Sequence, residues 1–362
     1  MDNIVNAVKR DLEARAIQSV RAASLPRPNG TLTSEATRPD SRFPTEGPVA
    51  HTAIPIPSSR PRSRSSTAER RIVVRKIPLT MSPAPATASI VNEWRADPVD
   101  RTALPIGTTH VSTTGPAIGG LYACTGGVTN GPGAFRAGPW IDEAAGTWNA
   151  EEKVAVRGAV RWPMAEYAET VKNGTRTIRS TGVPVKQVTG TFPIAADDPA
   201  AAYDRNPNRI APWALTMTMP ATPTAAATPT CLSLASVGVA RNGVAFYASI
   251  DERNRDAVAY ETQDVCDGHP QQAGQYHYHA VPSCLLDASK GASTVVGFAR
   301  DGFPIVVERN AAGELPTNAD LDECHGRTSP VLLDGEVVTT YHYSATYEFP
   351  YFIGCYRGEP VS

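Results

Sequence analysis

The sequence predicts a mainly β protein built on a duplicated β-rich unit with pseudo-twofold symmetry, braced by disulfides and preceded by a disordered basic arm. Three observations support this prediction. Proline (32) and glycine (28) make up roughly one in six of the 362 residues, which excludes a coiled coil or a helical bundle. The six cysteines are widely spaced, and the last third of the chain repeats a hairpin and a Tyr-His motif.

The net charge of −2 conceals an uneven distribution along the chain. Residues 1–80 hold 14 Lys and Arg against 7 Asp and Glu, residues 81–234 hold 12 of each kind, and residues 235–362 hold 8 against 17. No apolar run approaches the roughly 20 residues of a membrane-spanning helix, so we expect no transmembrane segment.

Residues 1–20 predict a short amphipathic helix, because apolar residues such as Val5, Val8 and Leu12 recur at helical spacing. The segment lacks the apolar core of a secretory signal, and acidic residues interrupt it. We therefore expect no signal peptide here.

Residues 21–88 predict a disordered arm rich in proline, serine and arginine. Its most basic segment, residues 58–66, reads SSRPRSRSS, and large apolar residues are scarce. Such a segment cannot bury enough surface to offset its ordering entropy. The simpler interpretation is a solvated tail, and the alternative is contact with an anionic partner such as nucleic acid, a membrane surface or an acidic protein.

The sequence of residues 89–235 predicts the β-rich first part of the folded body. We expect the folded body as a whole to be a β-sandwich. Alternating apolar residues predict strands at 153–162, 175–185 and 213–219. Residues 220–230, rich in Pro, Ala and Thr, predict a surface connector. We expect four tryptophans to anchor the core: Trp140, Trp148, Trp162 and Trp213.

Residues 236–362 predict a unit that occurs twice. Residues 237–246 (VGVARNGVAF) are similar to residues 296–305 (VGFARDGFPI), and each segment places Asn-Gly or Asp-Gly between two apolar runs. This pattern predicts hairpins with type I′ turns, which need positive φ at both central residues. A cysteine, a Tyr-His motif and a second cysteine follow each hairpin in the same order, so we infer two copies packed about a pseudo-twofold axis.

Six cysteines without a Cys-x-x-Cys pair fit three disulfides better than a zinc ribbon. Symmetry between the copies favours the pairs Cys266–Cys284 and Cys324–Cys355, which leaves Cys124–Cys231. A pairing between the two copies is the main alternative. Disulfides need an oxidising compartment, so we expect an extracellular, envelope or virus-particle location although no signal peptide is visible.

Several segments of the last third carry a specific resemblance: GHP at 268–270, GQYHYH at 274–279, PSC at 282–284, GFARDGFPI at 297–305, LDECHG at 321–326 and FPYFIGCYRG at 349–358. Through them the chain, from about residue 236 to 358, resembles the YHYH domain family. The resemblance implies an extracellular or envelope setting and supplies no established activity. Family members usually repeat the motif with a second histidine, whereas Ser344 stands at that position here.

The Tyr-His motif predicts a metal site. Alternate side chains of a strand share a face, so His277 and His279 point one way and the tyrosines the other. Two imidazoles on one face suit Zn or Cu, the cofactors that we expect. The third ligand would be one of His269, His325 and His342. Because Ser344 replaces one imidazole, we expect the site in the first copy.

Nearby polar side chains are candidates to orient the imidazoles by hydrogen bonding. They are Asp267, Asp301, Asp322, Glu323, Tyr276 and Tyr278. Asp301 is more simply a turn residue, and the acidic pair before Cys324 is more simply solvated or capping.

Three function classes remain open. The best interpretation is a metal-binding surface or extracellular protein. The alternatives are a structural or virus-particle protein whose Tyr/His strands are core, and a metal-dependent enzyme that uses the imidazoles for acid–base or metal-hydroxide chemistry. A substrate-sized pocket beside His277 would favour the enzyme, and a closed site would favour a structural role.

Overall fold

β-Strands form most of the regular structure in the computed structural model, which describes residues 90–128 and 133–361. The predicted mainly β class is confirmed for these residues. The helix predicted at 1–20 and the arm predicted at 21–88 lie outside the described residues. The strands are β1 Leu104–Pro105, β2 Val111–Ser112, β3 Leu121–Tyr122, β4 Ile141–Asp142, β5 Thr147–Trp148, β6 Tyr167–Lys172, β7 Thr175–Ser180, β8 Leu215–Pro220, β9 Ser236–Ala240, β10 Ala245–Tyr247, β11 Gly268–Pro270, β12 Tyr276–Tyr278, β13 Ser293–Ala299, β14 Pro304–Glu308, β15 Gly326–Leu333 and β16 Glu336–Ser344. The helices are α2 Ala257–Tyr260 and α3 Ser283–Ala288, with 3-10 turns η1 Gly107–His110, η2 Pro199–Ala202 and η3 Asn318–Asp320.

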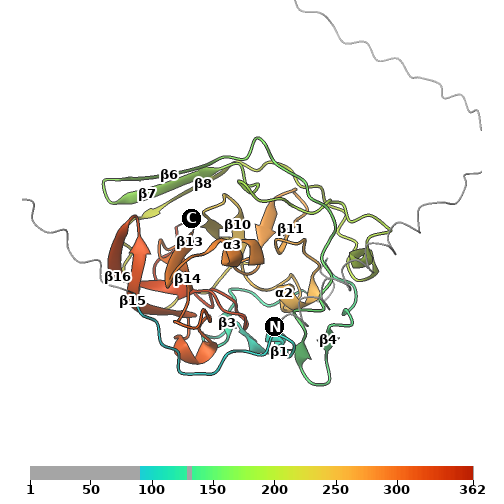
Figure 1. Ribbon diagram of the computed structural model, residues 1–362, viewed down its shortest axis with the longest axis horizontal. Coiled ribbons are helices and arrows are strands. Elements are labelled where there is room, and N and C mark those ends of the chain that lie inside the picture. The colour runs from blue at the N-terminus through green and yellow to red at the C-terminus, as the bar shows by residue number, and fades with distance from the viewer. Residues whose placement is uncertain (1–89, 129–132, 362) are drawn as a thin grey trace, which may run out of the picture. The chain divides into compact units, whose positions relative to one another are not determined.

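An eight-stranded sheet with the order β11-β12-β10-β9-β13-β14-β16-β15 carries the candidate site (Figure 1). On one side of the central β9–β13 pair, β9 and β10 are antiparallel, β10 and β12 are parallel, and β12 and β11 are antiparallel. On the other side, β13–β14, β14–β16 and β16–β15 follow the same succession of antiparallel, parallel and antiparallel pairs. We call β9–β12 the first half of the sheet and β13–β16 the second half.

The two hairpins predicted at Asn-Gly and Asp-Gly are confirmed, but the predicted type I′ turn is wrong. Gly243 and Gly302 have φ of +93° and +91°, whereas Asn242 and Asp301 are not among the residues with positive φ. Each loop therefore has three residues, a type I turn followed by a left-handed glycine. The reason lies in the Asn242 and Asp301 side chains, which each accept the backbone N–H two residues on and favour this turn.

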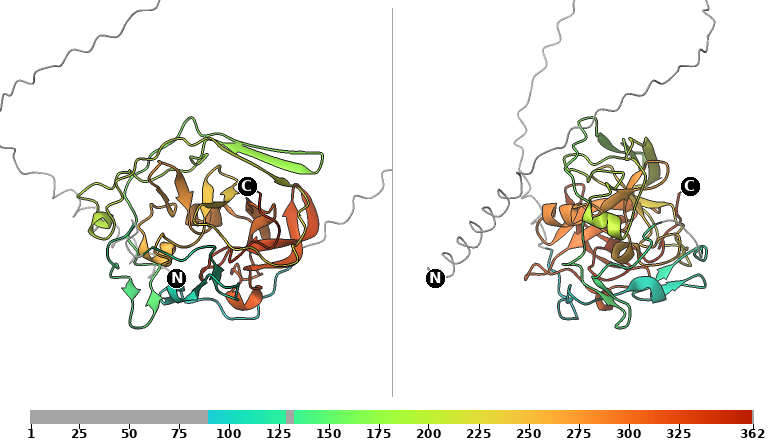
Figure 2. Two further views of the ribbon diagram at one scale, coloured as in Figure 1. Left: turned by 180° about the vertical axis from the view of Figure 1, so that it is seen from behind. Right: turned by 90° about the vertical axis from the view of Figure 1, so that its right-hand side faces the viewer.

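β6, β7 and β8 form an antiparallel sheet along one side of the large sheet (Figures 1 and 2). Ile178, Met217 and Met219 of this smaller sheet belong to one apolar cluster with Val239 and Phe298 of the large sheet. The two sheets are therefore two layers with a shared core at this place.

The strands predicted for the middle region are partly confirmed. Segment 175–185 contains β7, and segment 213–219 covers β8 except for its last residue, Pro220. The strand predicted at 153–162 is wrong, since only Val156 and Val160 make isolated bridges there. Gly158 lies between them with φ of +127°, which breaks the extended conformation.

The predicted tryptophan anchors are buried at two of four positions. Trp140 and Trp148 are 2% and 4% exposed, whereas Trp162 is half-buried and Trp213 is 40% exposed. Trp213 lies before Leu215, the first β8 residue that pairs with β7, so the smaller sheet does not cover it.

Three disulfides brace the described chain: Cys124–Cys231, Cys266–Cys284 and Cys324–Cys355. The last two begin just before β11 and just before β15, the strands at the two edges of the large sheet. Three disulfides fit an oxidising compartment. Two smaller sheets, β1-β5-β4 and β2-β3, complete the β structure of the described residues.

The described part of the chain contains no helix that is both long enough and apolar enough to span a bilayer.

Candidate metal centre

Three histidines of the first half meet on one side of β11 and β12. His269 on β11 pairs in register with His277 on β12, and His279 directly follows β12. All three side chains are buried, with 3–5% exposure. Each of the three offers one ring nitrogen, and these nitrogens all lie within 4.8 Å of one another. Among the described residues, this is the group of potential metal ligands that lies close enough together to share one ion. We call this group the histidine triad.

The tyrosines of the motif lie on the opposite face of β12, in the main apolar core. Tyr276 Oη donates to the Asp264 carboxylate at 2.9 Å, and Tyr278 Oη accepts from Asn242 Nδ2 at 2.9 Å. Neither tyrosine is exposed. They anchor the strand from the core side.

The ring orientations of His277 and His279 are fixed by backbone carbonyls. His277 Nδ1 lies 3.2 Å from the Gln275 oxygen, and His279 Nδ1 lies 2.5 Å from the Ala248 oxygen. A carbonyl oxygen only accepts, so each Nδ1 is assigned the proton and each Nε2 then carries a lone pair. The two Nε2 atoms lie 3.1 Å apart. Two lone pairs at this distance repel each other unless a cation binds both.

A carboxylate completes the cluster. Glu261 Oε2 lies 3.4 Å from His269 Nε2 and 3.4 Å from His279 Nε2. Within the described residues, this oxygen and both ring nitrogens of His269 lack a hydrogen-bond partner. Buried polar atoms are nearly always paired. The unpaired atoms that converge here could hold a metal ion.

Burial sets the protonation of these groups. It lowers the pKa of His269 and of His277 well below the usual range, reinforced by the neighbouring imidazoles, and lowers the pKa of His279 to about 4. Burial, together with the Asp251 and Asp204 carboxylates, raises the pKa of Glu261 well above its ordinary value. The imidazoles are therefore neutral near pH 7, the form that binds metals.

A cavity of about 780 Å³ adjoins the triad. Its wall includes the carboxylates of Asp204, Glu252 and Glu261, against one basic side chain, Arg205. Tyr247 stacks on His277 with the ring centroids 4.0 Å apart. The triad therefore borders an acid-lined space large enough for a small molecule.

The other two candidate histidines lie in the second half. His342 on β16 is buried, with Nε2 3.0 Å from Glu308. His325 is buried beside Thr346, with Nε2 2.9 Å from Oγ1. Neither belongs to the triad.

The acidic candidates contact groups other than the imidazoles. Asp267 accepts the Ser283 N–H, and Asp322 accepts from Tyr341 Oη. Asp301 accepts from Tyr343 Oη and from the Gly358 N–H, and it occupies the hairpin turn, in line with the simpler interpretation. Glu323 contributes its backbone oxygen, which lies 3.6 Å from the Cys355 sulfur.

Sequence reasoning missed Glu261, the Ala248 carbonyl and the role of Gln275. Glu261 directly follows α2, a single helical turn, and no spacing relates it to the Tyr-His motif. Gln275 precedes the motif, and Tyr247 Oη also donates to its side chain at 2.7 Å. The alternation of side chains on β12 could have indicated the Gln275 carbonyl, whereas Glu261 needs the tertiary structure.

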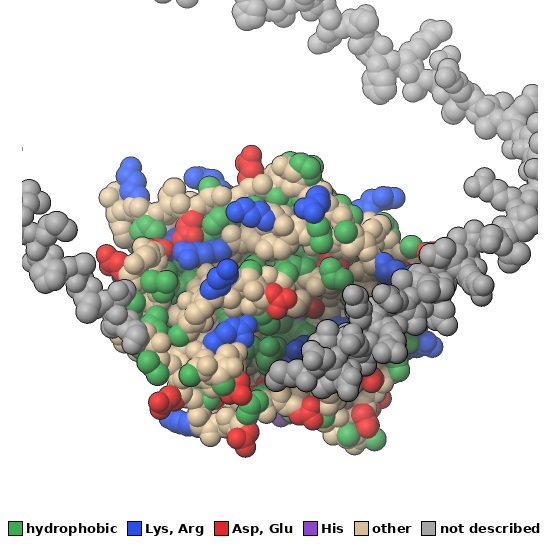
Figure 3. All heavy atoms as spheres, in the orientation of Figure 1, with side chains coloured by type: hydrophobic (Ala, Val, Ile, Leu, Met, Phe, Trp, Pro, Cys, Tyr) green, Lys and Arg blue, Asp and Glu red, His purple; other side chains and the backbone are tan. Residues whose placement is uncertain are grey.

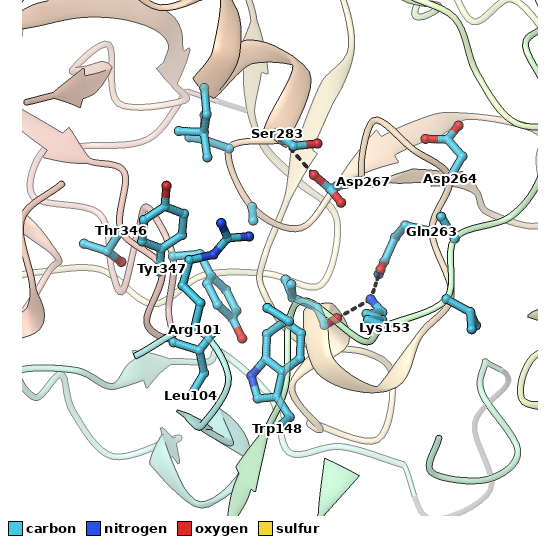
Figure 4. Close-up of a pocket in the computed structure, with 18 residues that line it drawn as sticks. Arg101, Leu104, Trp148, Lys153, Gln263, Asp264, Asp267, Ser283, Thr346 and Tyr347 are labelled. Carbon is cyan, nitrogen blue, oxygen red and sulfur yellow. Dashed lines mark hydrogen bonds between the residues drawn. The ribbon is translucent and has the colours of Figure 1, made fainter. Parts of the chain in front are cut away.

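A second cavity, of about 170 Å³, contains a buried amine (Figure 4). Arg101 and Lys153 approach it from opposite sides, with Trp148 between them. Lys153 Nζ donates to the Val258 carbonyl and to Gln263 Oε1. Burial lowers the pKa of Lys153 to about 8. Two acceptors already hold the ammonium group, which indicates a structural role.

Charged side chains are interspersed on the face seen in Figure 3, where basic, acidic and apolar groups of the described residues alternate. Among the described residues visible in this view, no extended area of positive charge, typical of a nucleic-acid surface, is seen.

Comparison with known proteins gives one match. Residues 216–316 match the model of the YHYH protein family, a range that includes the histidine triad and ends before the second Tyr-His segment at 341–344. No curated protein and no solved structure matches the chain. The resemblance carried by the motif at residues 276–279 is therefore confirmed: this chain contains a YHYH domain match in its C-terminal third.

Proposed function

We propose that this protein binds one Zn or Cu ion through His269, His277 and His279. The observation that carries the proposal is the approach of the His277 and His279 Nε2 atoms to 3.1 Å while both Nδ1 atoms face carbonyl oxygens. A tetrahedral ion with N ligands at about 2.0–2.1 Å would hold such atoms roughly 3.3 Å apart. A metal ion would turn this repulsive contact into two coordination bonds.

The chemistry of the donor set favours a Zn or Cu ion. Three neutral imidazoles are typical ligands of both metals, and the carbonyl bonds to Nδ1 are the usual way to fix a metal-binding histidine. Glu261 would serve as a fourth ligand or as the partner of a metal-bound water. The acidic wall of the cavity would attract cations to the site.

We place this function outside the cytosol, at a cell surface, in an extracellular space or on a virus particle. Support comes from the three disulfides, which fit an oxidising compartment. A contact of the basic arm with an anionic partner is compatible with each of these settings.

We also propose that the two halves of the large sheet are copies related by a pseudo-twofold axis. Their succession of strand pairings is the same on both sides of β9 and β13. Both hairpins also have the same three-residue loop with a left-handed glycine.

The test is a metal-binding titration of the full-length protein. Equilibrium dialysis against Zn²⁺ or Cu²⁺ is expected to give one ion per chain, and His277→Ala/His279→Ala is expected to lower the affinity at least 100-fold. His325→Asn is the matched control, since His325 is also buried and asparagine tolerates its φ of +67°. No bound metal in the wild type, or equal affinity in the double variant, would contradict the proposal.

A second candidate function is metal-dependent catalysis, favoured by one observation, the 780 Å³ cavity beside His277. A closed site would have indicated a structural ion. An exchangeable position facing this cavity would hold a water molecule for attack on a bound substrate. Azide is expected to change the visible spectrum of the Co²⁺-loaded or Cu²⁺-loaded protein if the position is open. A spectrum that does not respond to azide would exclude this candidate.

A further inference from the structure

The second half of the sheet carries another polar cluster, at the position that corresponds to the histidine triad. In the first half, His269 on β11 pairs with His277 on β12; in the second, Arg327 on β15 pairs with His342 on β16. His342 Nδ1 lies 3.2 Å from the carbonyl two residues earlier, the same distance as for His277 Nδ1. His342 therefore matches His277 in strand position and in the backbone contact of its ring.

The support behind the two clusters is also the same. Asp264 accepts a hydrogen bond from the first tyrosine of its motif and another from the backbone N–H of a disulfide cysteine. Asp322 makes the same two kinds of contact in the second half. The strands that carry both clusters are thus anchored to the core by the same chemistry.

Two of the three ligand positions differ between the halves. Arg327 stands where the first half has His269, and Ser344 stands where it has His279. The side chain of Glu308, the last residue of β14, reaches Arg327, Ser344 and His342. Its carboxylate lies 2.9 Å from Arg327 Nη2, 2.7 Å from Ser344 Oγ and 3.0 Å from His342 Nε2.

We infer that the Arg327–Glu308 ion pair takes the place of a metal ion in the second half, and that Arg327 and Ser344 confine metal binding to the first half. The inference rests on the proposed function. A fully buried carboxylate needs a cation, and the guanidinium supplies one while its Nε and Nη2 atoms donate to both carboxylate oxygens. A metal ion would meet the positive charge of Arg327. It would find one imidazole and a carboxylate that is already paired with Arg327, which are too few ligands for tight binding.

Restoring the two imidazoles tests the inference. Arg327→His/Ser344→His would place three histidines around Glu308 in the full-length protein. Because this change removes the cation beside a buried carboxylate, a second variant adds Glu308→Ser, which gives the residue found at the corresponding position Ser249. Arg327→Lys is the control, since it keeps the charge and supplies no imidazole. Each protein is folded in excess Zn²⁺, dialysed, and its bound Zn²⁺ is counted.

The expected result is two ions per chain for either histidine variant, and one for the wild type and for Arg327→Lys. One ion in both histidine variants, or failure of both to fold even with Zn²⁺, would overturn the inference while the wild-type count leaves the proposed function intact. No ion in the wild type would overturn the proposed function itself.

Discussion

Glu308 is a fully buried residue of the second half, and its charge affects stability. Although burial raises the pKa of Glu308, hydrogen bonds and charge from His342 and Arg327 lower it to about 2. The folded-state pKa lies below the unfolded value of about 4.5, so the ionised carboxylate stabilises the fold above pH 4.5, and this contribution is lost as the pH falls towards 2.

Glu308→Gln is therefore expected to lower the free energy of unfolding by about 3 kcal/mol at pH 7, because it leaves Arg327 and His342 without a buried anion. Urea denaturation at several pH values measures the effect, with the exposed Glu336→Gln as the control. The variant and the wild type should converge in stability between pH 4.5 and 2. A constant difference in stability between the variant and the wild type over this range would contradict the stabilising role of the ionised Glu308 carboxylate.

Lys153 affects the pH dependence of stability in a different way, because its charged form destabilises the folded state. Burial lowers its pKa from 10.5 to about 8, so the folded state is penalised below pH 8 and regains stability as the pH rises to 10.5. Relative to Lys153→Met, the wild type is expected to gain up to about 3 kcal/mol across this window. Lys172→Met is the control at an exposed site: it keeps Lys153, so in urea denaturation it should show the same slope as the wild type. A wild-type slope equal to that of Lys153→Met would exclude the effect.

At the residue scale, sequence reasoning succeeded where chemistry is local to one strand. The period of two on β12 placed His277 and His279 on one face, and His269 was one of three candidates for a third ligand. The choice among His269, His325 and His342 depends on which strands become neighbours, and a single sequence without this information leaves all three open. Glu261 enters the site only through the path of the chain after α2.

At the scale of elements, glycine substitutions in the loops test the turn geometry and its packing. A Cβ at Gly243 would lie 3.1 Å from Ser180 Cβ, whereas one at Gly313, with a similar φ of +87°, would meet no atom within 4 Å. Gly243→Ala and Gly313→Ala should both lose about 1–2 kcal/mol from the left-handed backbone. Thermal unfolding should show the larger loss for Gly243→Ala, and equal losses would argue against close packing of this turn.

The same scale shows where pattern reasoning fails. The two hairpins were predictable because Asn-Gly and Asp-Gly between apolar runs leave few alternatives. The apolar alternation at 153–162 looked like a strand, but Gly158 turns the backbone, and the segment makes only isolated bridges, at Val156 and Val160. Alternation reports a half-buried segment, and strand formation also needs a partner for the backbone groups.

At the scale of the whole molecule, the Cys124–Cys231 disulfide links the first part of the folded body to the start of the large sheet. It joins residues 107 positions apart, whereas Cys266–Cys284 spans 18. Loop-closure entropy predicts that Cys124→Ser/Cys231→Ser loses about 4–5 kcal/mol and Cys266→Ser/Cys284→Ser about 3 kcal/mol. Guanidinium denaturation compares them, and peptide mapping without reductant checks the pairs. A larger loss for the shorter loop would contradict this ranking.

The uneven distribution of charge along the sequence is also reflected in the structure at this scale. The acidic last third contributes Glu252 and Glu261 to the wall of the cavity beside the triad, while the basic arm lies outside the described residues. The sequence could indicate that the acidic part holds the histidines. It could not indicate that carboxylates and imidazoles share one cavity, because that proximity arises from tertiary packing.

X-ray absorption at the metal edge of the full-length protein loaded with one equivalent of Zn²⁺ or Cu²⁺ tests the central claim most directly. The account predicts three imidazole nitrogens at about 2.0 Å around the ion, and loss of this imidazole signal in His277→Ala/His279→Ala. A coordination shell of oxygens alone, or one unchanged by the double substitution, would contradict it.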